Sequence, residues 1–210
     1  MNAGEVRIPV GGVELTGDLL VPGGARGVVV FAHGSGSSRL STRNRRVAEY
    51  LRESGDFGTL LFDLLTPDED TVYERRFDIE LLAGRLSLVT DWLRAQPGTG
   101  HLPAGYFGAS TGAGAALVAA AGRNDIAAVV SRGGRPDLAG DALPRVSAPT
   151  LLIVGGADYQ VIELNRMAAA RLAGETEITI VPGATHLFEE PGALEEVSRL
   201  ARGWFERYVG

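Results

Sequence analysis

Short apolar runs alternate with amphipathic segments along most of the chain. Gly11-Gly12 separates two alternating apolar stretches, a pattern typical of a β-hairpin. The continuous apolar run over residues 27–32 is typical of a strand buried on both faces of a parallel sheet. Strands are therefore expected over residues 6–9, 13–21, 27–32, 58–65, 103–109, 126–131, 150–154 and 177–181.

Helical periodicity separates most of these strands. Pro97-Gly98 ends the longest amphipathic stretch, and Gly122 ends an alanine-rich one. Helices are expected from a cap at Ser41 or Thr42 to about Ser54, and over residues 78–95, 111–121, 161–172 and 194–208. Two N-terminal strands followed by regular β–α alternation predict an α/β fold, with helices on both faces of a mostly parallel central sheet. Residues 1–210 are expected to form a single domain.

Composition removes several kinds of chemistry. The chain has no cysteine, and all of its 20 basic residues are arginines. Disulfides, thiolate nucleophiles, Schiff-base lysines and P-loop lysines are therefore excluded. The net charge of −6 argues against nucleic acid and anionic membranes as partners, which leaves a small-molecule substrate. The sequence has no run of ~18 apolar residues and no signal-peptide pattern, so a cytoplasmic location is expected.

A Gly-x-Ser-x-Gly motif centred on Ser110 lies between an expected strand and an expected helix. This context is typical of a nucleophile elbow, in which a sharp turn exposes the serine hydroxyl. The same glycines, Gly108, Gly112 and Gly114, also fit the nucleotide-binding pattern of short-chain dehydrogenases. That alternative is weak, because the pattern normally lies near the N-terminus and the Tyr-x-x-x-Lys pair is impossible without lysine.

A serine hydroxyl needs a base, and the base needs an acceptor that fixes its tautomer. His186 and Asp158 each follow the carboxyl end of an expected strand, so they are expected to lie beside Ser110. The order Ser, Asp, His is that of one known scaffold for this triad. His33 is the competing base, but it is interpreted as a structural residue that holds the glycine-rich loop after it.

An acyl-transfer intermediate requires two donors for its oxyanion. The backbone N–H groups of Thr111 and Ser35 are expected to supply them. Arg132 and Arg135 follow an expected strand and are candidates for binding a substrate carboxylate, since guanidinium groups bind carboxylates in a bidentate manner. Arg76 is a candidate for substrate binding because the segment after the fourth expected strand is expected to border the pocket. Pairing with Asp137 or Asp141 is an alternative role for Arg132 and Arg135. A further cluster is expected to be a solvated face at a helix start: Arg39, Arg43, Arg45 and Arg46.

Together these loops resemble those of the α/β-hydrolase superfamily. The residues that carry the resemblance are Gly108-Ala109-Ser110-Thr111-Gly112, Gly155-Gly156-Ala157-Asp158, His186 and His33-Gly34-Ser35-Gly36. Residues 62–66, 131–137 and 183–188 look like the dienelactone-hydrolase-like branch of that superfamily. The resemblance covers essentially the whole chain and implies the α/β-hydrolase fold.

One departure limits what the resemblance implies. Dienelactone hydrolases proper use a cysteine nucleophile, whereas this chain has Ser110. The implied activity is therefore that of a serine esterase on short-chain esters or lactones, with no metal or cofactor. No cap domain is expected, because residues 133–148 are too few to form one. An acyltransferase or lyase on the same scaffold, or a binding protein that kept the fold, remain alternatives.

Overall fold

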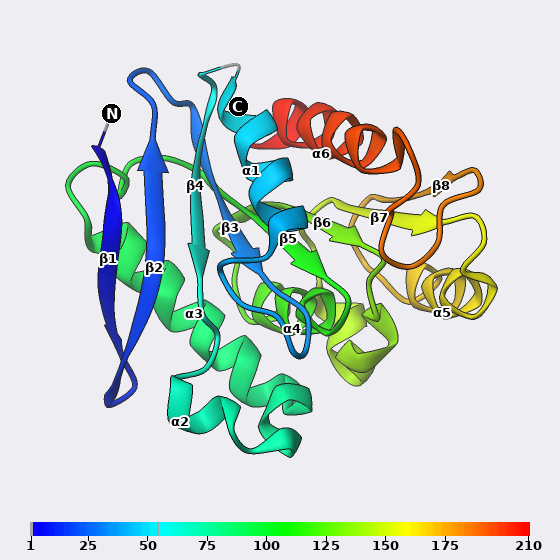
Figure 1. Cartoon of the computed structure of the whole chain (residues 1–210), viewed down its shortest axis with the longest axis horizontal. Coiled ribbons are helices and arrows are strands. Elements are labelled where there is room, and N and C mark those ends of the chain that lie inside the picture. The colour runs from blue at the N-terminus through cyan, green and yellow to red at the C-terminus, as the bar shows by residue number, and fades with distance from the viewer. Residues whose placement is uncertain (1, 54) are drawn as a thin grey trace.

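The elements of the chain surround one eight-stranded sheet (Figure 1). The structure is a computed structural model that describes residues 2–53 and 55–210. The strand order is β1-β2-β4-β3-β5-β6-β7-β8; β1 and β2 pair antiparallel, as do β2 and β4, and all other neighbours are parallel. The strands are β1 (Asn2–Val10), β2 (Val13–Val21), β3 (Gly27–Ala32), β4 (Phe57–Phe62), β5 (Ala104–Ala109), β6 (Ile126–Arg132), β7 (Thr150–Gly155) and β8 (Thr176–Val181). The expected mostly parallel sheet is confirmed.

Helices cover both faces of this sheet, as expected. Side chains of α1 and α6 pack on one face, and those of α3 and α4 on the other (Figure 1). The helices are α1 (Thr42–Glu53), α2 (Pro67–Asp70), α3 (Ile79–Ala95), α4 (Thr111–Ala121), α5 (Tyr159–Ala169) and α6 (Ala193–Tyr208), with 3₁₀ helices η1 (Tyr73–Phe77) and η2 (Pro136–Arg145). Ser54, the expected end of the first helix, lies outside the described residues. No helix in the described part of the chain combines the length and apolarity needed to cross a membrane.

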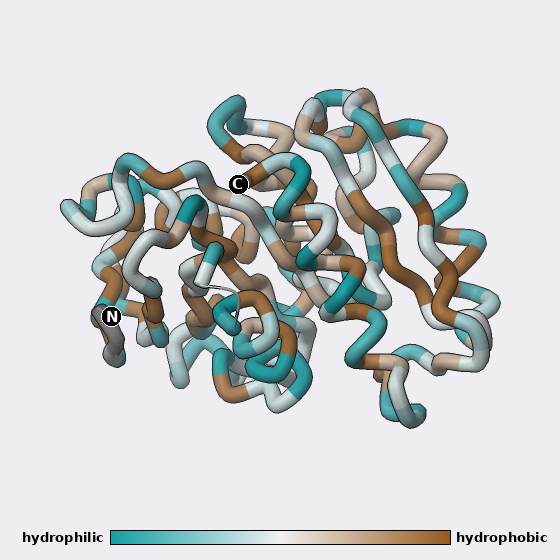
Figure 2. The backbone as a smooth tube through the Cα atoms, turned by 90° about the horizontal axis from the view of Figure 1, so that it is seen from above, coloured by the Kyte–Doolittle hydropathy of each residue, from teal (hydrophilic) through white to brown (hydrophobic). Residues whose placement is uncertain are grey.

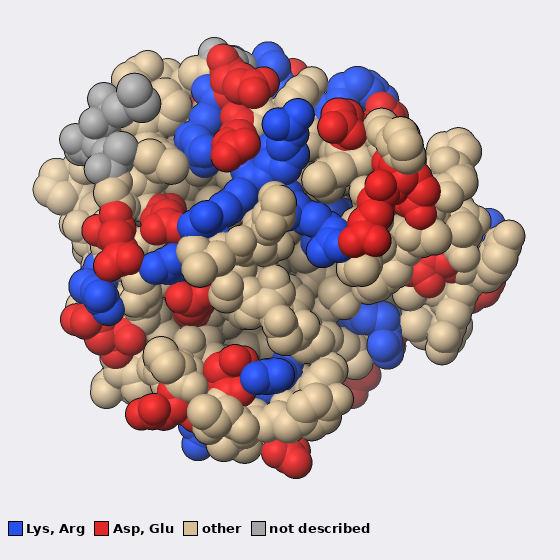
Figure 3. All heavy atoms as spheres, viewed as in Figure 1, with Lys and Arg blue, Asp and Glu red and all other residues tan. Residues whose placement is uncertain are grey.

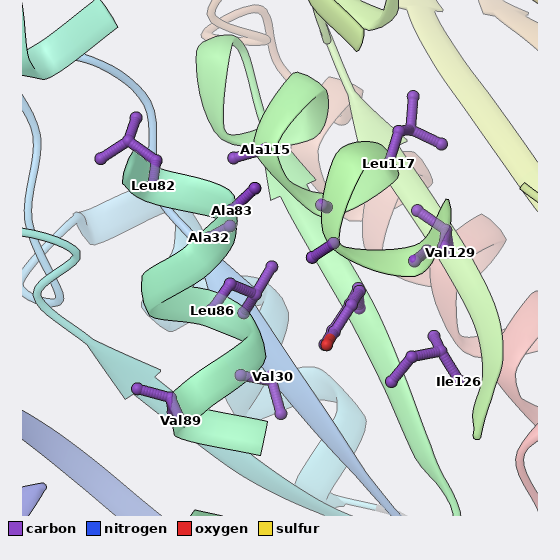
Figure 4. Close-up of a cluster of buried hydrophobic side chains, with 14 of the residues drawn as sticks. Val30, Ala32, Leu82, Ala83, Leu86, Val89, Ala115, Leu117, Ile126 and Val129 are labelled. Atoms are coloured by element: carbon purple, nitrogen blue, oxygen red, sulfur yellow. The ribbon is translucent and has the colours of Figure 1, made fainter. Parts of the chain in front are cut away.

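Alternating residues of the central strands supply two separate cores. On β3, Val28 and Val30 face α3 and α4, whereas Val29 and Phe31 face α1 and α6. Figure 4 shows the first core, where Leu86 and other side chains of α3 meet those of α4, β3 and β6. Apolar residues run along the central strands, and polar residues lie on the outward-facing sides of the helices (Figure 2). Burial on both faces explains why the β3 run is continuously apolar.

Two connections determine how open the edge of the sheet is. Between β6 and β7, where no cap domain is expected, the described residues contain η2 as their only helix. The segment between β4 and α3 contains α2 and η1, which sequence periodicity did not indicate. β4 itself ends at Phe62 rather than at residue 65. Asp63 N–H still donates to Thr16 O of β2 (3.0 Å), whereas Leu64 N–H leaves the sheet and donates to His33 Nε2 (3.1 Å).

Candidate active site

Ser110 lies in the turn between β5 and α4, at the edge where the parallel strands end. Its φ and ψ angles, 50° and −122°, fall in a region that residues other than glycine rarely adopt. Three backbone hydrogen bonds hold it there. Its N–H donates to Arg132 O (3.3 Å), and its carbonyl accepts from the N–H groups of Ala113 (3.0 Å) and Arg135 (3.0 Å). This is the geometry of a nucleophile elbow, and the Ser110 side chain does not cap α4.

Glycines allow the neighbouring backbone to approach this turn. A Cβ on Gly108 would lie 2.5 Å from Ala113 Cα, and one on Gly112 would overlap the carbonyl oxygen of Ala32. A Cβ on Gly34 would lie 3.1 Å from Ser110 Cβ. The loop that begins at His33 therefore lies directly against the serine, which is where a loop that contributes to an oxyanion hole must be.

His186 and Asp158 meet through their side chains. The Nδ1–H of His186 donates to Asp158 Oδ2 at 2.7 Å. The Asp158 side chain is 16% exposed and that of His186 is 38% exposed, so the carboxylate is sheltered while the imidazole reaches solvent. With Nδ1 engaged as a donor, Nε2 is the nitrogen left to accept a proton.

Two backbone hydrogen bonds join the loops that carry this pair. Ala157 N–H donates to Ala184 O (2.9 Å), and Gly156 N–H donates to Val181 O (2.8 Å). A Cβ on Gly155 would overlap the Ala184 carbonyl oxygen. The Gly-Gly sequence before Asp158 is thus required by the close approach of the two loops, in addition to any role in the turn.

Ser110 and His186 share one neighbour, the turn formed by residues 132–135. This turn supplies two of the three backbone partners of Ser110 described above. A Cβ on Gly133, whose φ is 49°, would lie 3.0 Å from His186 O and 3.6 Å from His186 Nδ1. Among the described residues no side-chain hydrogen bond joins Ser110 to His186; in unliganded enzymes such bonds are often long and tighten with substrate. The three predicted triad residues therefore lie at one edge of the sheet, with the Asp158–His186 contact formed.

His33 uses both ring nitrogens within the fold. Its Nε2 accepts from Leu64 N–H (3.1 Å), so its Nδ1 carries the proton and donates to Gly34 O (3.0 Å). Burial lowers the pKa of His33, although the bond to Gly34 and the nearby carboxylates of Asp63 and Asp70 act in the opposite direction. A neutral imidazole with both nitrogens bonded holds the loop in place, in agreement with its interpretation as a structural residue.

The two expected oxyanion donors contact each other. Ser35 N–H donates to Thr111 Oγ1 at 2.7 Å, and Thr111 is only 5% exposed. The Ser35 N–H is therefore not free to bind an oxyanion in this structure, because it donates to the Thr111 hydroxyl. That hydroxyl accepts from Ser35 and so keeps its own proton for donation to another group.

Two of the arginines expected to bind substrate have different surroundings. Arg76 is held within its own segment, where it pairs with Asp70 through Nε and Oδ1 at 2.9 Å. It still lines a small cavity with His33, Gly34 and Ser35. Arg132 is buried. Its side chain points to the face of the sheet covered by α1 and α6, because residues two apart on a strand share a face and Val130 faces that side.

Most of the other arginines form ion pairs. The expected pairing with Asp137 is found for Arg135 (2.8 Å) and not for Arg132. The expectation of a solvated arginine face is wrong for Arg39, whose side chain is only 16% exposed and pairs with Glu5 at 2.9 Å and with Asp63 at 3.4 Å. Those partners lie far away in sequence, which is why local charge patterning did not reveal them.

Sequence reasoning missed two residues that position the site. The Nδ2 group of Asn165, a fully buried residue on α5, donates to Gly134 O (3.0 Å) and so fixes the turn shared by Ser110 and His186. Thr185 Oγ1 donates to Glu190 Oε1 (2.6 Å) across the loop that carries His186. Asn165 could have been noticed as the one polar position on the otherwise apolar inner side of α5.

The sequence predicts no metal site, and this absence remains a prediction. Within residues 2–53 and 55–210, no three histidine, aspartate or glutamate side chains come together as metal ligands would.

The fold and the site together define a class of protein. An eight-stranded, mostly parallel sheet, a strained serine turn and an aspartate–histidine pair on later loops are the features of an α/β hydrolase. The crystal structure of the dienelactone hydrolase from Anabaena variabilis ATCC 29413 superposes with a TM-score of 0.96, at 56% identity over 100% of this chain and 99% of that one. The chain belongs to the dienelactone hydrolase family.

More distant structures share the fold. Est1E from Butyrivibrio proteoclasticus has a TM-score of 0.83 at 16% identity, over 97% of this chain and 98% of its own.

Two Mycobacterium tuberculosis proteins, from strains CDC 1551 / Oshkosh and ATCC 25618 / H37Rv, are each named "Putative phosphoribosyl transferase" and are 64% identical to this chain over 202 residues. The match covers 96% of this chain but 45% of theirs, so the chain spans about half the length of these curated relatives. No protein-family model matches the chain.

Proposed function

We propose that the protein is a serine hydrolase that cleaves carboxylic esters through an acyl-enzyme, with Ser110 as nucleophile, His186 as base and Asp158 as the residue that orients it. The observation that carries the proposal is the combination of the strained Ser110 backbone with the 2.7 Å bond from His186 Nδ1 to Asp158. A positive φ at a serine is costly and persists mainly where function requires it. Membership of the dienelactone hydrolase family supports the same reading.

The proposed reaction has two half-reactions. Ser110 Oγ attacks the acyl carbon while His186 Nε2 takes the serine proton, and the tetrahedral intermediate collapses as His186 returns that proton to the departing alcohol. Water then attacks the acyl-enzyme, His186 takes a proton from that water, and the acid leaves as Ser110 regains its proton. Asp158 keeps the Nδ1–H tautomer and stabilises the imidazolium in both steps.

The oxyanion of each intermediate would be held beside the His33–Ser35 loop. Thr111 N–H is the first donor, because it lies in the first turn of α4, directly after the nucleophile. The second is the pair formed by Ser35 N–H and the Thr111 hydroxyl: the amide donates to the hydroxyl, and the hydroxyl donates its own proton toward the oxyanion. Arg76, beside the same loop, is available to contact the leaving group or acyl chain.

Two measurements on purified protein test the proposal. Hydrolysis of p-nitrophenyl butyrate and covalent labelling by a fluorophosphonate should both require Ser110. Ser110→Ala should lower kcat by several orders of magnitude and abolish labelling, because triad members act as a unit. Ser87→Ala, in α3, where the Ser87 hydroxyl accepts from Arg123, is the matched control and should retain both. If Ser110→Ala keeps more than about a tenth of the activity, the nucleophile is a different residue.

Other activities can be separated in the same preparation. Added alcohols should raise the total turnover of an acyltransferase but only divert a small part of the product of a hydrolase. The name of the mycobacterial relatives suggests phosphoribosyl transfer, and we propose that any such activity resides in the half of those proteins that this chain does not match. Release of pyrophosphate from phosphoribosyl diphosphate by this chain alone would contradict that assignment.

A further inference from the structure

Arg132, the last residue of β6, is a buried arginine without a counter-ion. Only 7% of the residue is exposed. Within the described residues its side chain forms no ion pair, and the one hydrogen bond of that side chain runs from Nη2 to Asn44 Oδ1 at 3.5 Å, the limit of such a bond. Its Nε is fully buried and has no partner. A guanidinium has five N–H donors, so most of its bonding capacity is unused.

A second buried arginine shows how this protein normally treats such a charge. Arg85 is also 7% exposed. Its Nη2 pairs with Glu69 Oε1 at 2.8 Å, and its Nη1 donates to Val10 O at 3.0 Å. Buried charges are tolerated when they are paired in this way and are costly when they are not. Arg132 is the exception that needs an explanation.

The surroundings of Arg132 add further positive potential. Burial lowers the pKa of Arg132 to about 10, and the neighbouring charge of Arg43 acts in the same direction, so the group is still protonated at neutral pH. Asn44 and Arg43 lie in the first turn of α1, which contains no acidic residue. The N-terminal end of a helix carries a partial positive charge and favours anions.

Among the described residues, the carboxylates that line the neighbouring cleft form no ion pair with Arg132. Figure 3 shows a band of arginine side chains over α1 with acidic side chains along both of its sides. Glu189 pairs with Arg43, and Glu195 lies 4.0 Å from Arg46. Arg43, Glu189, Glu190 and Glu195 are among the residues that line a cleft of about 450 Å³ between the start of α1 and the segment after His186. Phe188, whose ring centroid lies 6.0 Å from Arg132 Cζ, also lines that cleft, so the cleft lies next to the unpaired guanidinium.

We propose that Arg132, with Asn44 and the first turn of α1, forms a binding site for a small oxyanion, a carboxylate or a phosphate. A planar guanidinium binds such groups through two parallel N–H···O bonds, which would satisfy the donors left unused here. The Arg132 side chain faces the side of the sheet covered by α1 and α6, and anion binding there does not depend on the proposed hydrolysis. The anion is either a free ion or the charged end of a substrate that reaches past Phe188.

Thermal unfolding with inorganic phosphate at constant ionic strength tests the site itself. The wild-type Tm should rise in a saturable manner, by about 5–10 °C at a phosphate concentration about 100 times Kd. Arg132→Gln should show no such rise. In phosphate-free buffer this variant should melt no lower than wild type, because it removes an unpaired buried charge. Arg45→Gln, on the exposed side of the same helix, is the control and should keep the phosphate response.

A second experiment identifies the source of the anion. A neutral ester, p-nitrophenyl butyrate, is compared with the mono-p-nitrophenyl ester of glutaric acid. If the site holds the charged end of a substrate, Arg132→Gln lowers kcat/KM for the acidic ester at least tenfold more than for the neutral one, and phosphate competes with it. If the site holds a free ion, both esters respond alike. A wild-type Tm that does not respond to phosphate, or an equal response in Arg132→Gln, would overturn the proposal.

Discussion

Replacing Thr111 by valine removes one hydroxyl from the proposed oxyanion hole and leaves the shape of the side chain almost unchanged. The hydroxyl accepts the Ser35 N–H at 2.7 Å, and Thr111 is almost fully buried. If the hydroxyl is an oxyanion donor, the variant loses transition-state stabilisation. Loss of one such donor typically lowers kcat by about 10²–10³-fold, or about 2.7–4 kcal/mol. Because the variant also frees the Ser35 amide, we expect the lower end, a fall of about 10²-fold.

The same variant should also be less stable. Valine leaves the Ser35 N–H without its acceptor, and an unsatisfied donor costs about 1–3 kcal/mol when it is buried. Ser35 is an exposed residue and its bond to Thr111 is only partly buried, so the lower end, a loss of about 1 kcal/mol, is expected, which corresponds to a fall in Tm of about 2–4 °C for a chain of this size. Thr111→Ser keeps the hydroxyl and should change kcat and Tm much less.

Steady-state kinetics on p-nitrophenyl butyrate and thermal unfolding measure these two effects separately. A hydroxyl that serves the transition state predicts a fall in kcat with little change in KM. If Thr111→Val loses stability but keeps kcat within a few-fold of wild type, the hydroxyl is a structural acceptor only. The Thr111 hydroxyl would then not be an oxyanion donor, and the Ser35 N–H would have to reach the oxyanion itself after Thr111 moves.

Three further predictions concern the core and the substrate. Thr90 Oγ1 donates to Leu86 O (2.8 Å), so the buried Tyr106 hydroxyl must donate to Thr90 Oγ1 (2.8 Å); Thr90→Val should therefore cost about 1–3 kcal/mol of unfolding free energy in urea, and Tyr106→Phe only about 0.5–1.5 kcal/mol. Burial raises the pKa of Tyr106 to about 12. The neutral Tyr106 side chain therefore contributes to the free energy of unfolding in full below about pH 10, and this contribution, on the order of 2–3 kcal/mol, is lost as pH rises through 12. Tyr106→Phe should remove this pH dependence from unfolding free energies measured in urea across that window. In a p-nitrophenyl ester series, kcat/KM should be highest for acyl chains of about two to six carbons, because a site without a cap cannot collect the ~0.8 kcal/mol available per buried CH₂; efficiency that rises to twelve carbons would contradict this.

Much of the fold could be predicted because local signals agree with the tertiary structure. β2, β3 and α4 have the expected bounds. Gly11 and Gly12 have φ angles of 55° and 83°, as the hairpin between β1 and β2 requires. The helix α4 was predictable because its alanine-rich run begins directly after Ser110 and ends at Gly122. The residues at both ends mark its limits without any contact to distant parts of the chain.

What could not be predicted depends on partners far away in sequence. β4 ends early because Leu64 N–H bonds to the ring of His33, and no local pattern indicates such a contact. Asn165 reaches Gly134 across a separation of 31 residues. Arg132 could be placed at the end of a strand from the sequence, but that position does not reveal whether a carboxylate lies opposite. The positions of charged side chains along the chain therefore do not reveal ion pairs between segments that are distant in sequence.

The turn after β6 explains how a strained serine can persist in this fold. A residue held at positive φ needs surroundings that over-determine its conformation. Residues 132–135 provide two of the backbone bonds that hold Ser110, and Asn165 in turn fixes that turn through Gly134 O. The same turn lies against His186 through Gly133. A change that loosens this turn should therefore misplace the nucleophile and the base together, although it touches neither side chain. For this reason the residues that hold Ser110 in place lie on α5 and in the turn that follows β6, outside the Gly-x-Ser-x-Gly motif.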